Sequence, residues 1–335
     1  MFDMDQKIDF QAQENATKMI GYVKKAAEIT HTVIMADQKA SKAVSAIQTQ
    51  DKSRKWTVLQ EYLKEYPIFC VPLVVTSGTE SYRDNIDITV ETIYARQKNE
   101  NFKTSLPRPQ DIEDVYSAIA RQGYTHVIVL MIAECLSSAN NLMRLAAEEH
   151  PELTVKVFDS KSASIGLGAL AVQVARYAVR GVAFDPLCEL TKRLIDDTVV
   201  YFSLDTLEYL QRGGRIGRAT ALAGGLLQIK PILTFDRKDG MISTAAKVRG
   251  RRGVQQRLIE LATELAAKHP GEEYNLVVCD GNVPEEGAAL EAALTRALPN
   301  AHRVLHGKID ATLAVHLGPN LLGVGVQFLN SKLPA

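Results

Sequence analysis

Aromatic side chains are scarce in this 335-residue chain, at 6% of the residues, although 46% of the residues are hydrophobic. The cores must therefore be built mainly from aliphatic side chains. Charge of one sign is also missing, because 39 lysines and arginines balance 39 aspartates and glutamates. A formal net charge of zero argues against broad, charge-driven binding to nucleic acid or to an anionic membrane. The length is enough for two ordinary domains.

Cysteines and long apolar runs are few as well. Cys70, Cys135, Cys188 and Cys279 stand far apart and form no CxxC pair, which favours reduced, buried thiols. No apolar stretch reaches the ~18 residues that a membrane helix needs. The N-terminus, MFDMDQKIDFQ, has acidic residues and no apolar signal core. We therefore expect a cytoplasmic protein without an integral membrane segment.

The motifs of several common chemistries are absent too. The sequence contains no GxxxxGK[ST] phosphate loop, no GxSxG nucleophile elbow and no HExxH zinc motif. Its nearest match to a dinucleotide fingerprint, Gly213 to Gly217, follows an expected helix rather than a strand. The seven histidines form no i,i+4 pair on an expected helix. We therefore expect neither a cofactor nor a metal site.

The first half of the chain alternates between strand and helix patterns. Short apolar runs predict buried strands over residues 68–75, 126–132 and 154–158, and longer stretches predict helices over residues 112–122, 140–149 and 167–179, the first and last of them followed by a glycine. This alternation is typical of an open, mainly parallel sheet with flanking helices. We assign this first α/β domain to residues 31–197, after an N-terminal helical appendage over residues 1–30.

The second half has a different pattern. Asp239 and Gly240 lie between two strand-like runs and are typical of a hairpin turn. Further strand patterns follow at residues 275–279, 302–306 and 322–328, and helix patterns at residues 254–268 and 285–298. We therefore expect a second α/β domain of mixed or antiparallel sheet over residues 198–335.

Small hydroxyl residues stand in the segments after expected strands. Thr104 and Ser105 precede a proline-rich turn, and Ser137 and Ser138 follow the strand over residues 126–132. Ligands of open α/β sheets bind at the carboxyl ends of the strands, where hydroxyls can reach them. The same residue types are preferred helix N-caps, so the pattern alone leaves capping and ligand binding both open.

A series of short segments spans most of the chain, from about Val71 to Gly325. The segments are YRDNIDIT (82–89), TSLPRP (104–109), CLSSA (135–139), DSKSASIGLG (159–168), DTLEYLQRGGRIGRATALAGGLLQIKPIL (205–233), KVRGRR (247–252) and HLGPNLLGVG (316–325). In this order they resemble the DegV family of bacterial fatty-acid-binding proteins. Each motif alone is unspecific, but the long block over residues 205–233 makes the series specific.

The resemblance implies a two-domain fold with a long-chain fatty acid in a slot between the domains. The tail is expected to be buried and the carboxylate to lie near the interface. Thr104, Ser137 and His316 match the threonine, serine and histidine of the family's motifs, and are the expected head-group donors. Two hydroxyls and one imidazole can donate to a carboxylate without leaving a formal charge buried in an empty slot.

The chain departs from the family pattern beside these donors. Where the family carries LSGT, the chain has LSSA with Ser138 in place of glycine, which we expect to narrow the slot. Where the family carries TSQPSP, the chain has TSLPRP, with Leu106 and Arg108 as replacements. We expect Arg108 to add a cation near the head group, and count Ser105 and Ser138 among the ligand-binding residues.

The resemblance further implies a carrier that does no covalent chemistry of its own and that can present the carboxylate to a separate fatty acid kinase subunit. Arg212 and Arg215, in the RGGRI segment, are the expected docking residues for such a partner. An alternative is an acyl-ester hydrolase using Ser137 and His316, for which the sequence shows no nucleophile elbow and no third residue. Nucleic-acid binding by the basic run over residues 247–252 is disfavoured by the zero net charge.

Overall fold

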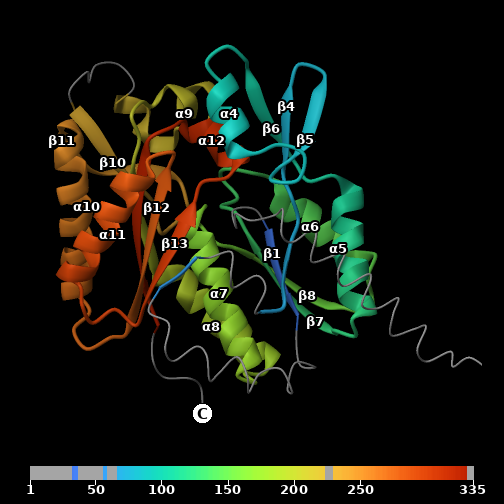
Figure 1. Ribbon diagram of the computed structural model, residues 1–335. Coiled ribbons are helices and arrows are strands. Elements are labelled where there is room, and N and C mark those ends of the chain that lie inside the picture. Colours follow the sequence, from blue (N-terminus) through green and yellow to red (C-terminus); the bar gives the residue numbers. More distant parts are fainter. Residues whose placement is uncertain (1–31, 37–55, 59–65, 223–228, 330–335) are drawn as a thin grey trace, which may run out of the picture.

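The computed structural model describes residues 32–36, 56–58, 66–222 and 229–329, whose arrangement is shown in Figure 1. The helical appendage expected over residues 1–30 lies outside these described residues. Among the described helices, none combines the length and the apolar character needed to cross a membrane.

Strands from the first half of the chain build a four-stranded sheet. Its order is β3 (Ile68–Cys70), β1 (Thr32–Ala36), β7 (His126–Met131) and β8 (Thr154–Asp159). β7 and β8 run parallel, whereas β1 is antiparallel to both of its neighbours. Within the described part of this four-stranded sheet, the expected parallel arrangement therefore holds for β7 and β8 alone. An apolar run predicts that a strand is buried, but it carries no information about the direction of that strand.

Helices cover both faces of this sheet, as β7 illustrates. Val127 packs into a core with residues of α5 (Pro109–Arg121) and α6 (Ala139–Glu148). Leu130 belongs to the core around α7 (Ile165–Val179) instead. Because successive side chains of a strand point to opposite faces, a strand that serves two cores needs a continuous apolar run. The observed bounds of α5, α6 and α7 confirm the three helices predicted for this half of the chain, to within a few residues at their ends.

A separate three-stranded antiparallel sheet carries Thr104. Its order is β5 (Glu80–Arg83), β4 (Val74–Ser77) and β6 (Phe102–Ser105), and α4 (Val90–Arg96) connects β5 to β6. The single strand predicted over residues 68–75 is wrong, because β3 and β4 belong to different sheets. Pro72 stands at the break, and a proline cannot donate a backbone hydrogen bond to a sheet ladder.

The second half of the chain forms most of a seven-stranded mixed sheet, as predicted. Its order is β11 (Ile242–Arg249), β10 (Ile229–Phe235), β9 (Thr198–Ser203), β14 (Leu321–Phe328), β12 (Tyr274–Gly281), β13 (Arg303–Lys308) and β2 (Trp56–Val58). The pairs β12–β13 and β13–β2 are parallel, and the other pairs are antiparallel. β2 comes from the segment assigned to the first domain, so one edge of this sheet is supplied by the first half of the chain.

α7 joins the two halves of the molecule. It packs against β1 and β7 of the four-stranded sheet and against β9, β12, β13 and β14 of the seven-stranded sheet (Figure 1). Nearly all of its residues are buried, as expected of a helix that is apolar on every side. The largest hydrophobic core is therefore continuous across both halves, with Leu130 at one end and Val277 at the other.

The remaining helices lie at the edges of this arrangement. α10 (Gly250–Ala267) and α11 (Pro284–Ala297) form a second core with the seven-stranded sheet, and α8 (Phe184–Asp196) packs against α7. α12 (Ala311–Leu317) lies between α4 and α9 (Glu208–Arg212), at the top of Figure 1. A 3₁₀ helix, Gly217–Leu222, follows α9. Three of the described helices, α4, α8 and α12, were not predicted from the sequence.

Candidate functional site

A cavity of about 280 Å³ lies where the three sheets meet α7 and α12. Most of its wall is apolar, with Val200 and Phe202 from β9, Phe235 from β10, Cys279 from β12 and Ile165 from α7. Burial raises the pKa of the Cys279 thiol far above its usual range, so this cysteine lines the cavity as an apolar, protonated group. The cavity draws on both halves of the chain.

One end of the cavity is polar, and most of the predicted site residues meet there. Thr104 Oγ1 and His316 Nε2 are hydrogen-bonded at 2.8 Å, although β6 and α12 are 212 positions apart in the sequence. Ser105, Ser137 and Ser138 line the same cavity. The geometry therefore brings together the threonine, the serine and the histidine that the family resemblance singled out.

His316 is held in its neutral form at this end of the cavity. Burial lowers its pKa to about 4, and the positive charge of Arg215 acts in the same direction. Its Nδ1 atom is buried and has no hydrogen-bond partner among the described residues. A neutral imidazole with one N–H can donate to a ligand carboxylate or exchange a hydrogen bond with Thr104.

Gly213 makes the position of His316 possible. A Cβ atom at Gly213 would lie 2.1 Å from His316 Nδ1, so only glycine lets this backbone approach the ring so closely. Gly318, two positions after His316, is likewise packed against Tyr209, because a Cβ there would lie 2.5 Å from the Tyr209 ring. The glycines of the RGGRI and HLGP segments therefore serve close packing around the histidine.

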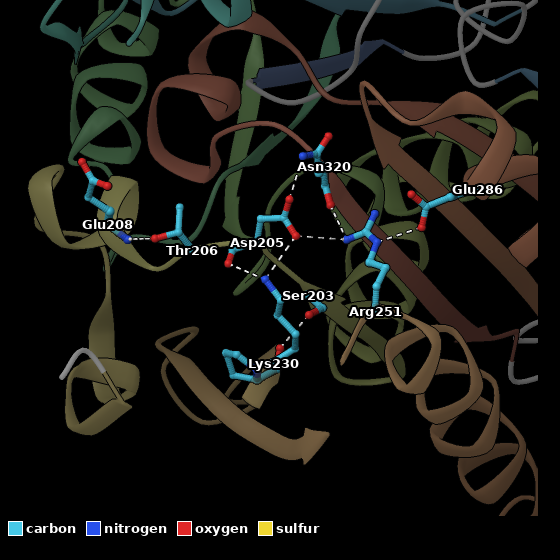
Figure 2. A network of polar contacts seen from close by, with 9 residues as sticks. Ser203, Asp205, Thr206, Glu208, Lys230, Arg251, Glu286 and Asn320 are labelled. Carbon is cyan, nitrogen blue, oxygen red and sulfur yellow. Dashed lines mark hydrogen bonds and ion pairs between the residues drawn. The ribbon is translucent and has the colours of Figure 1, made fainter. Parts of the chain in front are cut away.

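The long motif over residues 205–233, which contains the RGGRI segment, is held at its start by a polar network around Asp205 (Figure 2). Asn320 Nδ2 donates to Asp205 Oδ2 at 2.6 Å, and Arg251 donates to the Asn320 carbonyl at 2.6 Å. Lys230 Nζ donates to the Asp205 carbonyl at 2.8 Å. Asn320 has a φ of +67°, a left-handed conformation that asparagine tolerates better than most residues. The turn after His316 is thus tied to the segment that packs against His316.

The two arginines predicted to dock a partner are placed differently from each other. Arg215 lines the cavity, and its Nε donates to the Leu136 carbonyl at 3.1 Å. Arg212 is exposed and lies with its guanidinium 4.9 Å from the ring centroid of Tyr209. Arg215 is therefore a pocket residue attached to the loop that carries Ser137, and the sequence signal for this role was only its neighbouring glycines.

Arg108 is not among the residues that line the cavity. Its guanidinium donates to the Ser81 carbonyl at 3.2 Å and lies 4.0 Å from Asp87 Oδ2. Arg108 is the N-cap residue of α5, and its side chain extends along β5 rather than toward Thr104. The cation that the described residues bring to the polar end is Arg215 instead.

Ser137 and His316 are not hydrogen-bonded to each other among the described residues. Ser137 Oγ accepts a hydrogen bond from the Ala139 N–H at 3.3 Å, close to the start of α6. His316 is bonded to Thr104 and has no carboxylate on Nδ1 to orient the ring as a general base. No group of three or more histidine, cysteine or acidic side chains in the described part of the chain is arranged to hold a metal.

The fold and the cavity define an α/β protein with a mainly apolar pocket that has a polar cluster in its wall. A family model described as uncharacterised proteins of the DegV family matches residues 56–329. A DegV domain-containing protein of Clostridium acetobutylicum is 32% identical over 266 residues, which cover 79% of this chain and 93% of the relative. The chain therefore belongs to the DegV family.

Solved structures agree with this assignment. A DegV family protein from Thermus thermophilus, described by its fatty acid binding, superposes with a TM-score of 0.71 at 30% identity, covering 77% of this chain and 91% of the other. A stearic acid-binding protein from Eubacterium ventriosum gives a TM-score of 0.73 at 28% identity, covering 80% and 94%. DegV of Bacillus subtilis, a fatty acid binding protein, gives 0.72 at 28% identity with the same coverage.

Proposed function

We propose that this chain binds a long-chain fatty acid, with the carboxylate at Thr104, Ser137 and His316 and the tail in the apolar cavity. The observation that carries the proposal is the Thr104–His316 hydrogen bond at the polar end of an otherwise apolar cavity. Solved relatives that are named for fatty acid binding support the same ligand class.

The chemistry of the polar end suits a carboxylate. Hydroxyl and imidazole groups donate without a permanent charge of their own, and Arg215 adds one cation at the cavity wall. Tail burial supplies most of the affinity, because each buried methylene contributes roughly 0.8 kcal/mol. About 15 methylenes contribute ~12 kcal/mol, from which the loss of motional freedom is subtracted.

The binding we propose involves no covalent step on this chain. The carboxylate lies at the cavity end formed by Thr104 and Ser138, and Ser138 is exposed, so a separate kinase subunit can reach the head group. Arg212, which is exposed beside Tyr209, is the docking residue that we propose for such a partner. Arg215 contributes to the same interface from the cavity wall.

Mass spectrometry of the purified protein, first native and then denatured and extracted, tests the proposed ligand. We expect a stoichiometric fatty acid, or uptake of added hexadecanoic acid by a ligand-free preparation. Thr104→Val should weaken that uptake about 5- to 10-fold, because one polar contact to the head group is lost. Thr263→Val, which alters an exposed hydroxyl on α10, is the matched control. A protein that neither retains nor takes up fatty acid would refute the proposal.

A further inference from the structure

The cavity contains two hydroxyl groups that the head-group cluster does not use. Thr312 on α12 and Ser164 at the start of α7 both line the cavity. They are 3% and 9% exposed, so both are well shielded from water. Neither hydroxyl oxygen has a hydrogen-bond partner among the described residues. Buried hydroxyls in folded proteins are normally bonded, so each orphan indicates a missing partner.

Local structure does not supply that partner. Ser164 is the N-cap residue of α7, where a serine side chain usually accepts a hydrogen bond from the helix, but it makes no such bond. Its φ of 55° and ψ of −132° differ from the extended backbone of an N-cap, which accounts for the missing bond. The Thr312 backbone N–H is bonded to Asp84, whereas the Thr312 hydroxyl has no partner among the described residues.

Thr312 has a defined relation to the head-group cluster. It precedes His316 by four positions on α12, so the two side chains share one face of the helix. One helical turn is ~5.4 Å long. That length corresponds to roughly four bonds of an extended chain, because bonds of about 1.5 Å that alternate in direction advance about 1.25 Å each. Four bonds also separate a carboxylate oxygen from the oxygen of a 3-hydroxyl group. Because both residues line the cavity, a ligand whose carboxylate contacts His316 and whose tail follows α12 toward its first turn passes Thr312 within its first few carbon atoms.

We propose that the cavity prefers an acyl chain that carries a hydroxyl group near the carboxylate, with 3-hydroxy fatty acids as the ligand class. Thr312 is the principal partner of this hydroxyl, and Ser164 is the second polar contact. The inference rests on the proposed fatty acid binding and specifies its ligand. An unsubstituted methylene beside Thr312 leaves the buried hydroxyl unbonded, whereas a hydroxyl on the chain can both donate to it and accept from it.

Affinities for 3-hydroxyhexadecanoic acid and hexadecanoic acid, measured by calorimetry on the full chain, test this preference. We expect the hydroxy acid to bind about fivefold more tightly or better, since it satisfies an otherwise unbonded group. A comparison of 12-hydroxyoctadecanoic acid with octadecanoic acid controls for the position of the hydroxyl on the chain. We expect the two affinities to be equal, because a hydroxyl on carbon 12 lies beyond Thr312.

Two valine variants distinguish the loss of a ligand contact from a general effect of removing a buried hydroxyl. Thr312→Val keeps the side-chain shape, so it should fold, bind hexadecanoic acid and lose the preference for the hydroxy acid. Thr191→Val is the matched control, because Thr191 is also fully buried but is bonded to the Leu187 carbonyl on α8 and does not line the cavity. That variant should retain the preference.

The outcomes distinguish the two proposals. Equal or weaker binding of the 3-hydroxy acid, with hexadecanoic acid still bound, would mean that a water molecule satisfies the two hydroxyls and would overturn this inference alone. A preference that survives in both Thr312→Val and Ser164→Ala would overturn the assignment of the site. Absence of binding by either acid would overturn the proposed function together with the inference.

Discussion

The backbone N–H of Thr312 donates a 2.8 Å hydrogen bond to Asp84 Oδ2, although the two residues are 228 positions apart. The N–H of Ala311 donates to the other carboxylate oxygen at 3.1 Å. Asp84 is 2% exposed, and its two carboxylate oxygens hold the first turn of α12 through these hydrogen bonds. The last turn of α12 carries His316. The YRD segment is therefore a positioning element that acts on the histidine through α12.

Asp84→Asn should loosen this attachment. One side-chain oxygen becomes an N–H donor that faces a backbone N–H, and the negative charge at the start of α12 is lost. We expect the free energy of unfolding in urea to fall by about 1–3 kcal/mol and fatty acid affinity to fall with it. Asp87→Asn, in an exposed pair with Arg83, should change stability by less than ~1 kcal/mol. Wild-type behaviour of Asp84→Asn would contradict this role.

Gly213→Ala should damage the site more than the fold. The backbone of Gly213 has a φ of −76°, which alanine adopts without strain, but the new Cβ would meet His316 Nδ1 at 2.1 Å. We expect a displaced ring and a fatty acid affinity reduced at least about 10-fold, with a loss of stability below ~2 kcal/mol. Gly214→Ala is the matched control. The Gly214 φ of +70° would strain an alanine backbone, but a Cβ at this position would have no other atom within 4 Å. It should lower stability without a specific loss of binding.

His316 should contribute a pH dependence to stability. Its pKa is about 4 in the folded protein, below the ~6.5 of an unfolded chain. The unfolded state therefore takes up a proton first as the pH falls, and stability declines from about pH 6.5 down to about pH 4 by ~3 kcal/mol. The difference between the unfolding curves of wild type and His316→Gln over this window measures the effect. An imidazole that titrates near pH 6.5 by NMR would contradict it.

His306 should act in the opposite sense. Its hydrogen bond to Asp280, 3.4 Å from Nε2 to Oδ2, raises the pKa of the imidazole, and Glu291 on the other ring nitrogen adds to the shift. Because the folded pKa is raised, the stabilisation is complete below about pH 6.5 and is lost as the pH rises through the folded value. His306→Gln should remove this dependence in urea titrations between pH 6 and 8. A wild-type slope in that variant would argue against the charged contact.

The spacing of hydrophobic residues in the sequence was sufficient to predict the helices that bury one face. The amphipathic stretches predicted α5, α6, α10 and α11, and the Asp239-Gly240 turn predicted the β10–β11 hairpin. α7, which is buried on nearly every side, was predicted from its length and from Gly181 after its end. α8 could have been found by the same reasoning, because Leu187, Leu190 and Leu194 recur at helical spacing. α12 is only seven residues long and buried nearly all round, so it shows no amphipathic period.

The site depended on information that a local pattern does not contain. Thr104 and His316 were found through their motifs, while their hydrogen bond is a contact between distant parts of the chain. The position of an arginine in a motif does not predict where its side chain lies. Arg108 extends along β5, whereas Arg215 lines the cavity. The orphan hydroxyl of Thr312 is visible only when every potential partner has been placed around it.

The core shared by both halves also bears on how quickly a cargo can be exchanged. Since α7 packs on two sheets at once, the halves cannot swing apart as rigid bodies without exposing their largest core to water. The cavity is lined instead by residues of the short elements α9 and α12, and we expect a bound tail to leave past these elements. We therefore expect the residence time of the ligand to depend on local opening of these two elements.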